Sequence, residues 1–176
     1  MNYRLQDTSY GTIALVFSNS KAIRIFLPDT KTSLRKAILS AFPDADEDPS
    51  GMNELTDLIV RYFEGKDVSI PIDHVDTSLV TPFQLRVLLT ERTIPRGMTA
   101  SYSWLARNAG TEAIRAAGSA LARNPWPIVI PCHRAVRMDR TIGSYQGGAE
   151  MKQRLLMMEG VSFEDTGKVA RDHFLK

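Results

Sequence analysis

The chain is poor in the residues that bind metals and form disulfides. Its 176 residues include one cysteine, Cys132, and three histidines, His74, His133 and His173. A single thiol excludes a disulfide within the chain and favours a reducing compartment, so we expect a cytoplasmic protein, or a nuclear one in a eukaryote. Structural zinc sites are built from several cysteines and histidines, and one cysteine with three scattered histidines does not supply such a set. We therefore expect no metal.

Long apolar runs are also absent. No stretch approaches the ~18 residues of a membrane span, and the first ten residues, MNYRLQDTSY, do not resemble a signal peptide. The composition is ordinary for a globular protein, with 43% hydrophobic and 24% charged residues. These features argue against a membrane partner, and the length is sufficient for one large domain or two small ones.

Charge is distributed unevenly along the chain, although the net charge is only +2. Residues 1–76 contain 8 lysines and arginines against 12 acidic residues, whereas residues 77–160 contain 11 against 5, and 10 of those 11 are arginine. Arginine carries a planar fork of N–H donors that suits phosphate. The second half is therefore expected to meet a polyanion, with solubilising surface charge as the alternative.

Residues 1–76 are predicted to form a small α/β domain. Two apolar, partly β-branched runs, 10–16 and 22–27, flank the polar stretch SNSK and predict a β-hairpin. Apolar residues at helical spacing predict two helices, and the run VSIPI predicts an edge strand because it contains a proline. These elements lie at 33–41, 52–63 and 68–72. No motif in this part of the chain carries chemistry.

Residues 77–176 are predicted to form a mainly α-helical domain. Thr81 precedes a proline and stands three residues before a glutamine, which is typical of a helix N-terminus. Two further helices, capped by Ser101 and Thr111 and separated by Gly110, form a helix-turn-helix candidate. The predicted fold is an α/β N-terminal domain followed by a mainly α domain with a winged-helix-like helix-turn-helix.

The helix expected after Thr111 presents one cation, Arg115, among small residues that include Ala116, Gly118 and Ser119. Gly118 lowers helix stability by ~1 kcal/mol relative to alanine, so the small side chain requires a reason. A helix with a small face can approach another helix in a core or the floor of a nucleic-acid groove, and both remain open. The lone arginine favours the groove, where its side chain could enter the duplex.

The only cysteine lies in the stretch NPWPIVIPCHRAV. Its PIVI segment, residues 127–130, predicts a buried strand that Pro131 ends, so Cys132 is expected where strand becomes turn. A thiol reacts as the thiolate, and the imidazole of His133 could take its proton. An inert buried cysteine is the alternative, and adjacency alone does not decide between them.

The stretch AEMKQRLLMMEG predicts a helix that ends at Gly160 and places Glu159 in its last turn, beside the apolar face. The helix dipole disfavours a negative charge at that end by ~0.3–1 kcal/mol. The carboxylate is therefore either solvated or held by a cationic or hydrogen-bonding partner such as an imidazole. The sequence leaves both open.

Five blocks carry a resemblance to a known family: IPRGMTASY, IRAAGSALARNP, IPCHR, GSYQGG and LLMMEG. In this order and spacing, over roughly residues 80–160, they closely resemble the O6-alkylguanine-DNA alkyltransferases, also called methylated-DNA–protein-cysteine methyltransferases. The resemblance implies a DNA repair enzyme that flips O6-alkylguanine out of double-stranded DNA, entered from the minor groove. It implies a monomer that transfers the alkyl group irreversibly to its own cysteine, in a single turnover and without a cofactor.

The resemblance also implies catalytic roles at matching positions. Cys132 would accept the alkyl group, His133 would take the thiol proton, and Glu159 would orient that histidine. Asn124 would tie the recognition helix to the active-site turn, and Tyr102 would lie beside the DNA backbone and the guanine.

Further roles concern DNA and the flipped base. Arg115 would fill the gap that the extruded nucleotide leaves in the duplex. The DNA-binding residues implied are Arg115, Ala116, Gly118, Ser119 and Arg123. Tyr145, the Gln146 backbone and Gly147 would form a lid over the base and supply hydrogen-bond donors to O6. Main-chain carbonyls around Cys132 and Ala135 would read the exocyclic amine of guanine.

Two alternative functions come from other classes. Some relatives in this family bind damaged guanine without a reactive cysteine, and Cys132 argues against that function. A helix-turn-helix regulator that senses oxidation or alkylation through Cys132 is the second alternative. The GSYQGG segment and Glu159 argue against it, because a regulator needs neither.

Overall fold

The computed structural model describes residues 1–176, and the chain divides into two compact units. The N-terminal unit comprises residues 1–79 together with 125–129, and the C-terminal unit comprises residues 80–124 and 130–176. The domain boundary expected between residues 76 and 77 lies close to the point where the chain passes from the N-terminal to the C-terminal unit, between residues 79 and 80. The return of residues 125–129 to the N-terminal unit was not expected.

The N-terminal unit is built on a four-stranded sheet in the order β3-β2-β1-β4. Its strands are β1 (Asn2–Thr8), β2 (Gly11–Ser18), β3 (Lys21–Asp29) and β4 (Asp46–Glu47). The predicted hairpin is β2 and β3, which pair antiparallel. Its two-residue turn, Asn19 and Ser20, has positive φ at both positions, as a tight hairpin turn requires. β1 was not predicted, because its sequence, NYRLQDT, has too few apolar residues to show the pattern of a strand.

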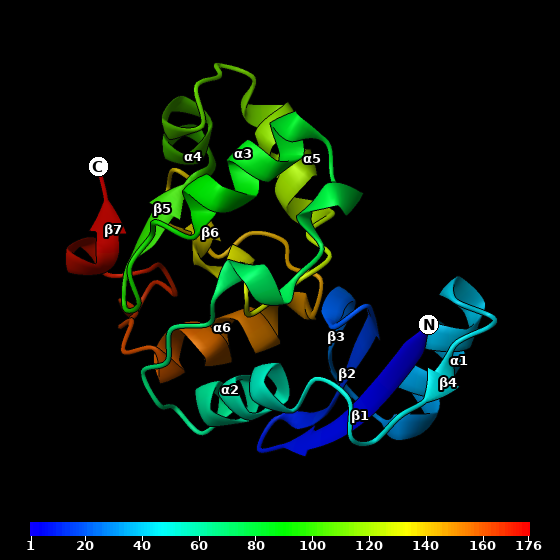
Figure 1. Cartoon of the computed structure of the whole chain (residues 1–176). Helices are drawn as coiled ribbons and strands as arrows, with labels where there is room; N and C mark the ends of the chain where they lie inside the picture. Colours follow the sequence, from blue (N-terminus) through cyan, green and yellow to red (C-terminus); the bar gives the residue numbers. More distant parts are fainter. The chain divides into compact units, whose positions relative to one another are not determined.

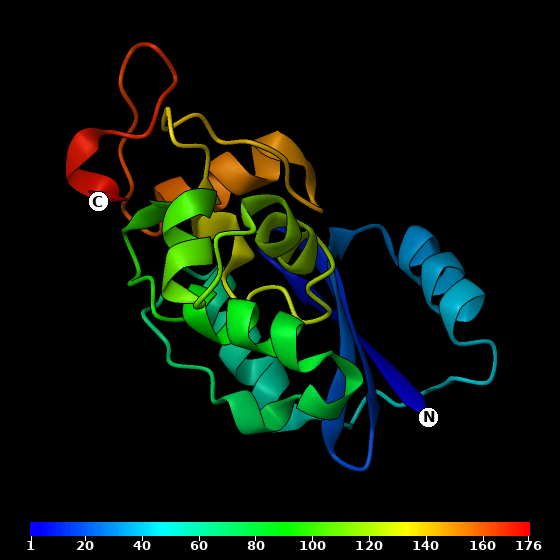
Figure 2. The same ribbon diagram turned by 90° about the horizontal axis from the view of Figure 1, so that it is seen from above.

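Two helices flank this sheet, α1 (Lys31–Ala41) and α2 (Asn53–Phe63), and the strands run between them in both views (Figures 1 and 2). Both helices were predicted from the spacing of their apolar residues. A core cluster joins sheet and loop residues to α1; its buried members are Tyr3, Ala14, Val16, Leu34, Ile38 and Ala45. Burial of apolar side chains such as these is the main favourable contribution to the folding of this unit.

The edge strand expected at 68–72 is wrong. Residues 68–71 have no regular structure, and Ile72–His74 forms a short 3-10 turn. Pro71 lacks the backbone N–H that a strand would offer to its neighbour, so the segment cannot complete a ladder there. Three other 3-10 turns, Thr77–Leu79, Cys132–Arg134 and Arg171–His173, lie elsewhere in the chain.

The buried strand expected at 127–130 is also wrong. The segment is buried, but Ile128 has a φ of 76°, a left-handed conformation that interrupts any strand, and Pro127 has no N–H to donate. Nearby, Trp126 is fully buried within the N-terminal unit and its Nε1 donates to the carbonyls of Ala22 and Ile23, at 3.1 Å each. Tertiary packing therefore determines the conformation of this apolar run.

Helices dominate the C-terminal unit: α3 (Pro82–Glu91), α4 (Tyr102–Asn108), α5 (Ile114–Ala122) and α6 (Gly148–Met158). α3, α4 and α5 pack against one another (Figure 1). The predicted caps of the first two are present, because Thr81 accepts a hydrogen bond from the Gln84 N–H and Ser101 accepts one from the Trp104 N–H, at 3.2 and 3.0 Å.

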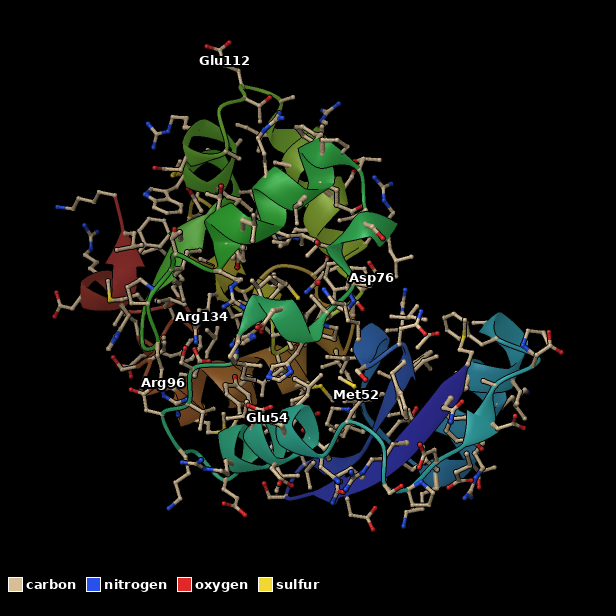
Figure 3. The ribbon with its side chains drawn as sticks, viewed as in Figure 1. Met52, Glu54, Asp76, Arg96, Glu112 and Arg134 are labelled. Atoms are coloured by element: carbon tan, nitrogen blue, oxygen red, sulfur yellow. The ribbon has the colours of Figure 1, made fainter.

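The cap expected at Thr111 is wrong, because α5 begins only at Ile114. The Thr111 hydroxyl instead accepts from the N–H of Ala113 at 3.1 Å, which tightens the loop between α4 and α5. Glu112 projects outward from this loop (Figure 3). The two successive helices are present, and their use as a DNA-binding helix-turn-helix is considered below.

A small parallel sheet completes the C-terminal unit, in the order β6-β5-β7. Its strands are β5 (Thr99–Ser101), β6 (Ala135–Val136) and β7 (Phe174–Leu175). β5 leads directly into α4, and β6 directly follows the 3-10 turn Cys132–Arg134. The sheet thus brings the start of α4 and the turn that carries Cys132 to neighbouring positions. None of the helices has the length and apolar character needed to cross a bilayer.

Candidate active site

Cys132 is the first residue of the 3-10 turn Cys132–Arg134 and is only 5% exposed. Its N–H donates to the Ile130 carbonyl at 2.8 Å, and the Arg134 N–H donates to the Pro131 carbonyl at 2.9 Å, so the turn is tightly closed. The side-chain amide of Asn124 donates to Cys132 Sγ at 3.2 Å. The structure thus brings the thiol to the end of α5, which Asn124 follows.

Burial raises the pKa of the Cys132 thiol to about 12. The hydrogen bond from Asn124 and the positive charge of Lys152 act in the opposite direction, whereas the carboxyl group of Glu91 adds to the increase. The thiol is therefore protonated at neutral pH in the free protein. It needs a proton acceptor before it can act as a nucleophile.

A buried network of three side chains lies directly after Cys132. His133 Nε2 is 2.9 Å from Glu159 Oε1, and Arg134 donates from Nε and Nη2 to the two oxygens of the same carboxylate at 2.8 and 2.9 Å. The side chains of His133 and Glu159 are completely buried. Of the two possibilities left open for Glu159, solvation is wrong and the partnered carboxylate is present.

The charges in this network follow from its geometry. Burial opposes ionisation of Glu159, but His133 and Arg134 together hold the pKa of the carboxyl group far below its usual range. Burial lowers the pKa of His133, and this outweighs the attraction of Glu159. An ionised carboxylate can only accept, so Nε2 of the neutral imidazole donates to Glu159 and Nδ1 carries the lone pair.

A cavity of about 730 Å³ opens over the thiol, within the range of about 300–1,000 Å³ that is typical of small-molecule sites. Its walls come from α4, α5, the turn that carries Cys132 and the segment 137–146. It gathers seven of the residues expected from the sequence: Tyr102, Arg115, Gly118, Ser119, Cys132, Tyr145 and Gln146. The cavity is large enough for a purine base.

The other expected residues do not line this cavity. His133, Glu159 and Asn124 are buried, and two of the DNA-binding candidates, Ala116 and Arg123, are exposed. Gly147 precedes the first turn of α6, and Ala135 is buried in β6. The Ala135 carbonyl, expected to read the exocyclic amine of guanine, already accepts a hydrogen bond from Lys152 Nζ at 2.5 Å.

Sequence reasoning missed several side chains at the site. Arg134 was adjacent to the cysteine and the histidine, but nothing showed that it would hold Glu159. Lys152 and Glu91 lie at helical spacing with buried leucines of α6 and α3, and a charge on an apolar helix face was the signal that could have identified them. The remaining cavity-lining residues are Ile114, Leu121, Ala122, Arg137 and Ser144.

Glu91 and Lys152 are both completely buried in the C-terminal unit. Burial raises the pKa of Glu91 to about 8, against the opposing charges of Lys152 and Arg134. Burial lowers the pKa of Lys152 to about 8, against the attraction of Glu91. Lys152 Nζ also donates to the Ser144 carbonyl at 3.3 Å, so it links the turn after Cys132 to the segment that precedes α6.

No group of three or more histidine, cysteine, aspartate or glutamate side chains is arranged to hold a metal ion. The polar side chains that line the cavity are instead a thiol, two tyrosine hydroxyls, two serine hydroxyls, two arginines and one amide. Such a set can bind a planar heterocycle and supply a nucleophile.

Comparison with known proteins shows that the chain is similar to methylated-DNA–protein-cysteine methyltransferases. The sequence profile of the family described as "6-O-methylguanine DNA methyltransferase, DNA binding domain" matches residues 82–161. The chain is 47% identical over 116 residues to the methylated-DNA–protein-cysteine methyltransferase of Methanothermobacter thermautotrophicus, a match that covers 66% of this chain and 65% of the relative. It is 37% identical over 132 residues to the protein of the same name from Archaeoglobus fulgidus, covering 72% of this chain and 87% of the relative.

Among solved structures, the crystal structure of Mycobacterium tuberculosis OGT in complex with DNA matches with a TM-score of 0.78. The two chains are 29% identical, and the match covers 90% of this chain and 92% of that one. The chain thus shares the fold of that protein. It spans between 45% and 65% of the length of the first curated relatives that it matches.

The buried carboxyl group of Glu91 predicts a specific dependence of stability on pH. Between its ordinary pKa of 4.5 and the raised value of about 8, the folded protein keeps a proton that the unfolded chain has released. This contribution therefore reduces the free energy of unfolding as pH rises from 4.5 to 8, by up to about 1.4 kcal/mol per pH unit. Glu91→Gln removes it, so the variant should gain stability relative to the wild type between pH 5 and pH 8, measured by urea unfolding.

The matched control for this experiment is Glu112→Gln, the same substitution on an exposed loop. A difference between wild type and Glu91→Gln that stays constant across this range would contradict the buried, protonated carboxyl group.

Proposed function

The chain belongs to the methylated-DNA–protein-cysteine methyltransferase family, and on this premise we propose that it repairs O6-alkylguanine in DNA by direct reversal. It flips the damaged base out of the duplex and moves the alkyl group to its own Cys132. The observation that carries the proposal is the thiol at a base-sized cavity, followed directly by the buried His133–Glu159 pair. A purely structural cysteine has no need of either.

The chemistry begins with removal of the thiol proton. The proton passes from Cys132 to Nδ1 of His133, through a water molecule, and Glu159 stabilises the imidazolium that forms. The thiolate sulfur then attacks the alkyl carbon, and the bond between that carbon and O6 breaks. The electron pair of the broken bond remains on the purine, which takes up a proton from water to become guanine, and the imidazolium of His133 returns its proton to water.

Negative charge that develops on the purine needs a hydrogen-bond donor. The Tyr145 hydroxyl is buried at the cavity, and burial raises its pKa well above the usual value, so it remains a donor throughout the reaction. The Gln146 N–H, in the same segment, is a second donor for O6. The thioether formed on Cys132 is not hydrolysed, so each molecule acts once.

Recognition of DNA is assigned to α4 and α5, acting as a helix-turn-helix that enters the minor groove. α5 presents Arg115 beside Gly118 and Ser119 at the mouth of the cavity, and its small side chains allow close approach to the sugars and phosphates. Extrusion of a base costs a few kcal/mol, and an arginine inserted into the stack offsets part of that cost. The solved relative bound to DNA supports this partner for the family fold.

Physiologically, we assign the protein to the cytoplasm, or to the nucleus in a eukaryote, acting as a monomer without a metal or other cofactor. The positive balance of residues 77–160 supports its association with a polyanion.

The first prediction concerns the nucleophile. Incubation with a duplex that contains O6-methylguanine should add one methyl group per protein, on the peptide that contains Cys132, as read by intact-mass and peptide mass spectrometry. Cys132→Ala should abolish the transfer and keep affinity for DNA, because the groove contacts come from α5. An unmodified wild-type protein that binds the damaged duplex would support the non-catalytic binder instead.

The second prediction concerns Glu159. Glu159→Gln keeps the shape of the side chain but removes the charge that stabilises the imidazolium, so single-turnover transfer should slow by roughly 100-fold. Affinity for DNA should change little. The matched control is Glu164→Gln, which removes the other carboxylate that pairs with an arginine in this unit, Arg140. Equal rates in wild type and Glu159→Gln would rule out the assigned role.

The third prediction separates base flipping from ordinary binding. If Arg115 fills the vacated stack, Arg115→Ala should slow transfer from a duplex far more than transfer from single-stranded DNA or free O6-benzylguanine, where nothing is unstacked. Arg123→Ala, at the other end of α5, is the control that should only weaken affinity and lower the salt slope by about 1. Equal losses on all three substrates would contradict the role of Arg115.

A further inference from the structure

The side chain of Gln146 joins the segment over the cavity to the end of α5. Its Nε2 donates to the Ala122 carbonyl at 3.1 Å and to the Asn124 carbonyl at 3.0 Å. Ala122 is the last residue of α5, and the side chain of Asn124 donates in turn to Cys132 Sγ. Two residues thus connect the cavity segment, the end of α5 and the thiol.

Gln146 is not the only side chain that caps the end of α5. A second glutamine, Gln84 of α3, donates from Nε2 to the carbonyls of Ala120 and Arg123 at 3.2 and 3.1 Å. The two amides therefore divide the exposed carbonyls of one helix end between them. Only Gln146 lines the cavity, and only Gln146 lies in the segment that carries Tyr145.

We propose that the Gln146 side chain is a positioning residue, which fixes the segment 144–147 against the end of α5 and so sets where Tyr145 and the Gln146 N–H meet the base. This inference rests on the proposed function and extends it, because that function uses only the backbone of Gln146. The consequence is specific. Loss of the two side-chain hydrogen bonds impairs the chemical step on any substrate that enters the cavity, whether or not it is attached to DNA.

The position also couples the two parts of the reaction. α5 is the helix assigned to the minor groove, and the segment around Tyr145 is assigned to the base. The hydrogen bonds from Gln146 make the position of the segment 144–147 depend on the position of α5. Arg115, by contrast, acts before the base enters the cavity, so the two residues should be distinguishable by substrate.

The test uses Gln146→Glu in the whole chain. The substitution keeps the size of the side chain, but it replaces two donors by a carboxylate that faces two carbonyl oxygens at the negative end of a helix. Single-turnover transfer from free O6-benzylguanine and from the damaged duplex should slow by a similar factor, at least about 10-fold for two lost hydrogen bonds. Affinity for an undamaged duplex should fall only by the amount that the same added charge causes in Gln84→Glu.

Gln84→Glu is the matched control, because it places the same charge at the same helix end without touching the cavity segment. Its urea midpoint should fall by an amount comparable to that of Gln146→Glu, while its transfer rate on free O6-benzylguanine stays within about twofold of the wild type. Gln146→Arg keeps N–H donors in reach of both carbonyls and should recover most of the rate.

Three results overturn the inference alone: an unchanged rate in Gln146→Glu, equal slowing in both glutamate variants, or a loss confined to the duplex. In each of these, the wild type still alkylates Cys132. Absence of alkylation in the wild type overturns the proposed function as well, so the two failures are distinguishable.

Discussion

The buried carboxylate of Glu159 is the group on which the rest of the site depends. A charge enclosed in a protein is tolerated only when ion pairing and hydrogen bonds replace the lost water. Arg134 supplies the opposite charge through two N–H groups, and the imidazole of His133 supplies a third donor. Both partners belong to the turn that begins at Cys132, so the need to satisfy one carboxylate at the end of α6 holds that turn in place.

Other buried polar contacts converge on the same turn. Asn124 reaches Cys132 from the end of α5, and Lys152 reaches the Ala135 carbonyl from α6. Partly satisfied buried polar networks are unfavourable, so each contact restricts the positions of the others. The result is a thiol held at the edge of a preformed cavity, beside a neutral imidazole and an ionised carboxylate. Such pre-organisation limits the rearrangement needed when a base enters.

Much of the C-terminal unit could be predicted from the sequence, because the relevant rules are local. Threonine and serine caps located the starts of α3 and α4, and the spaced motifs identified Cys132 and its neighbours. The conformation of residues 127–130 could not be predicted, since a left-handed isoleucine violates the local preference and is stabilised by distant packing. The pairing of Arg134 with Glu159 was equally inaccessible, because the partner of a buried charge depends on residues brought together only by the fold.

The central claim is that burial keeps His133 neutral and that Glu159 holds the ring proton on Nε2, which leaves Nδ1 as the acceptor for the thiol proton. The most direct test is nitrogen NMR of histidine-labelled protein, with the His133 signals assigned from their loss in a His133→Asn variant. The account predicts a neutral ring at pH 6.5, where an ordinary histidine is half protonated, with the proton on Nε2 and none on Nδ1. An imidazolium at that pH, or a neutral ring protonated on Nδ1, would contradict it.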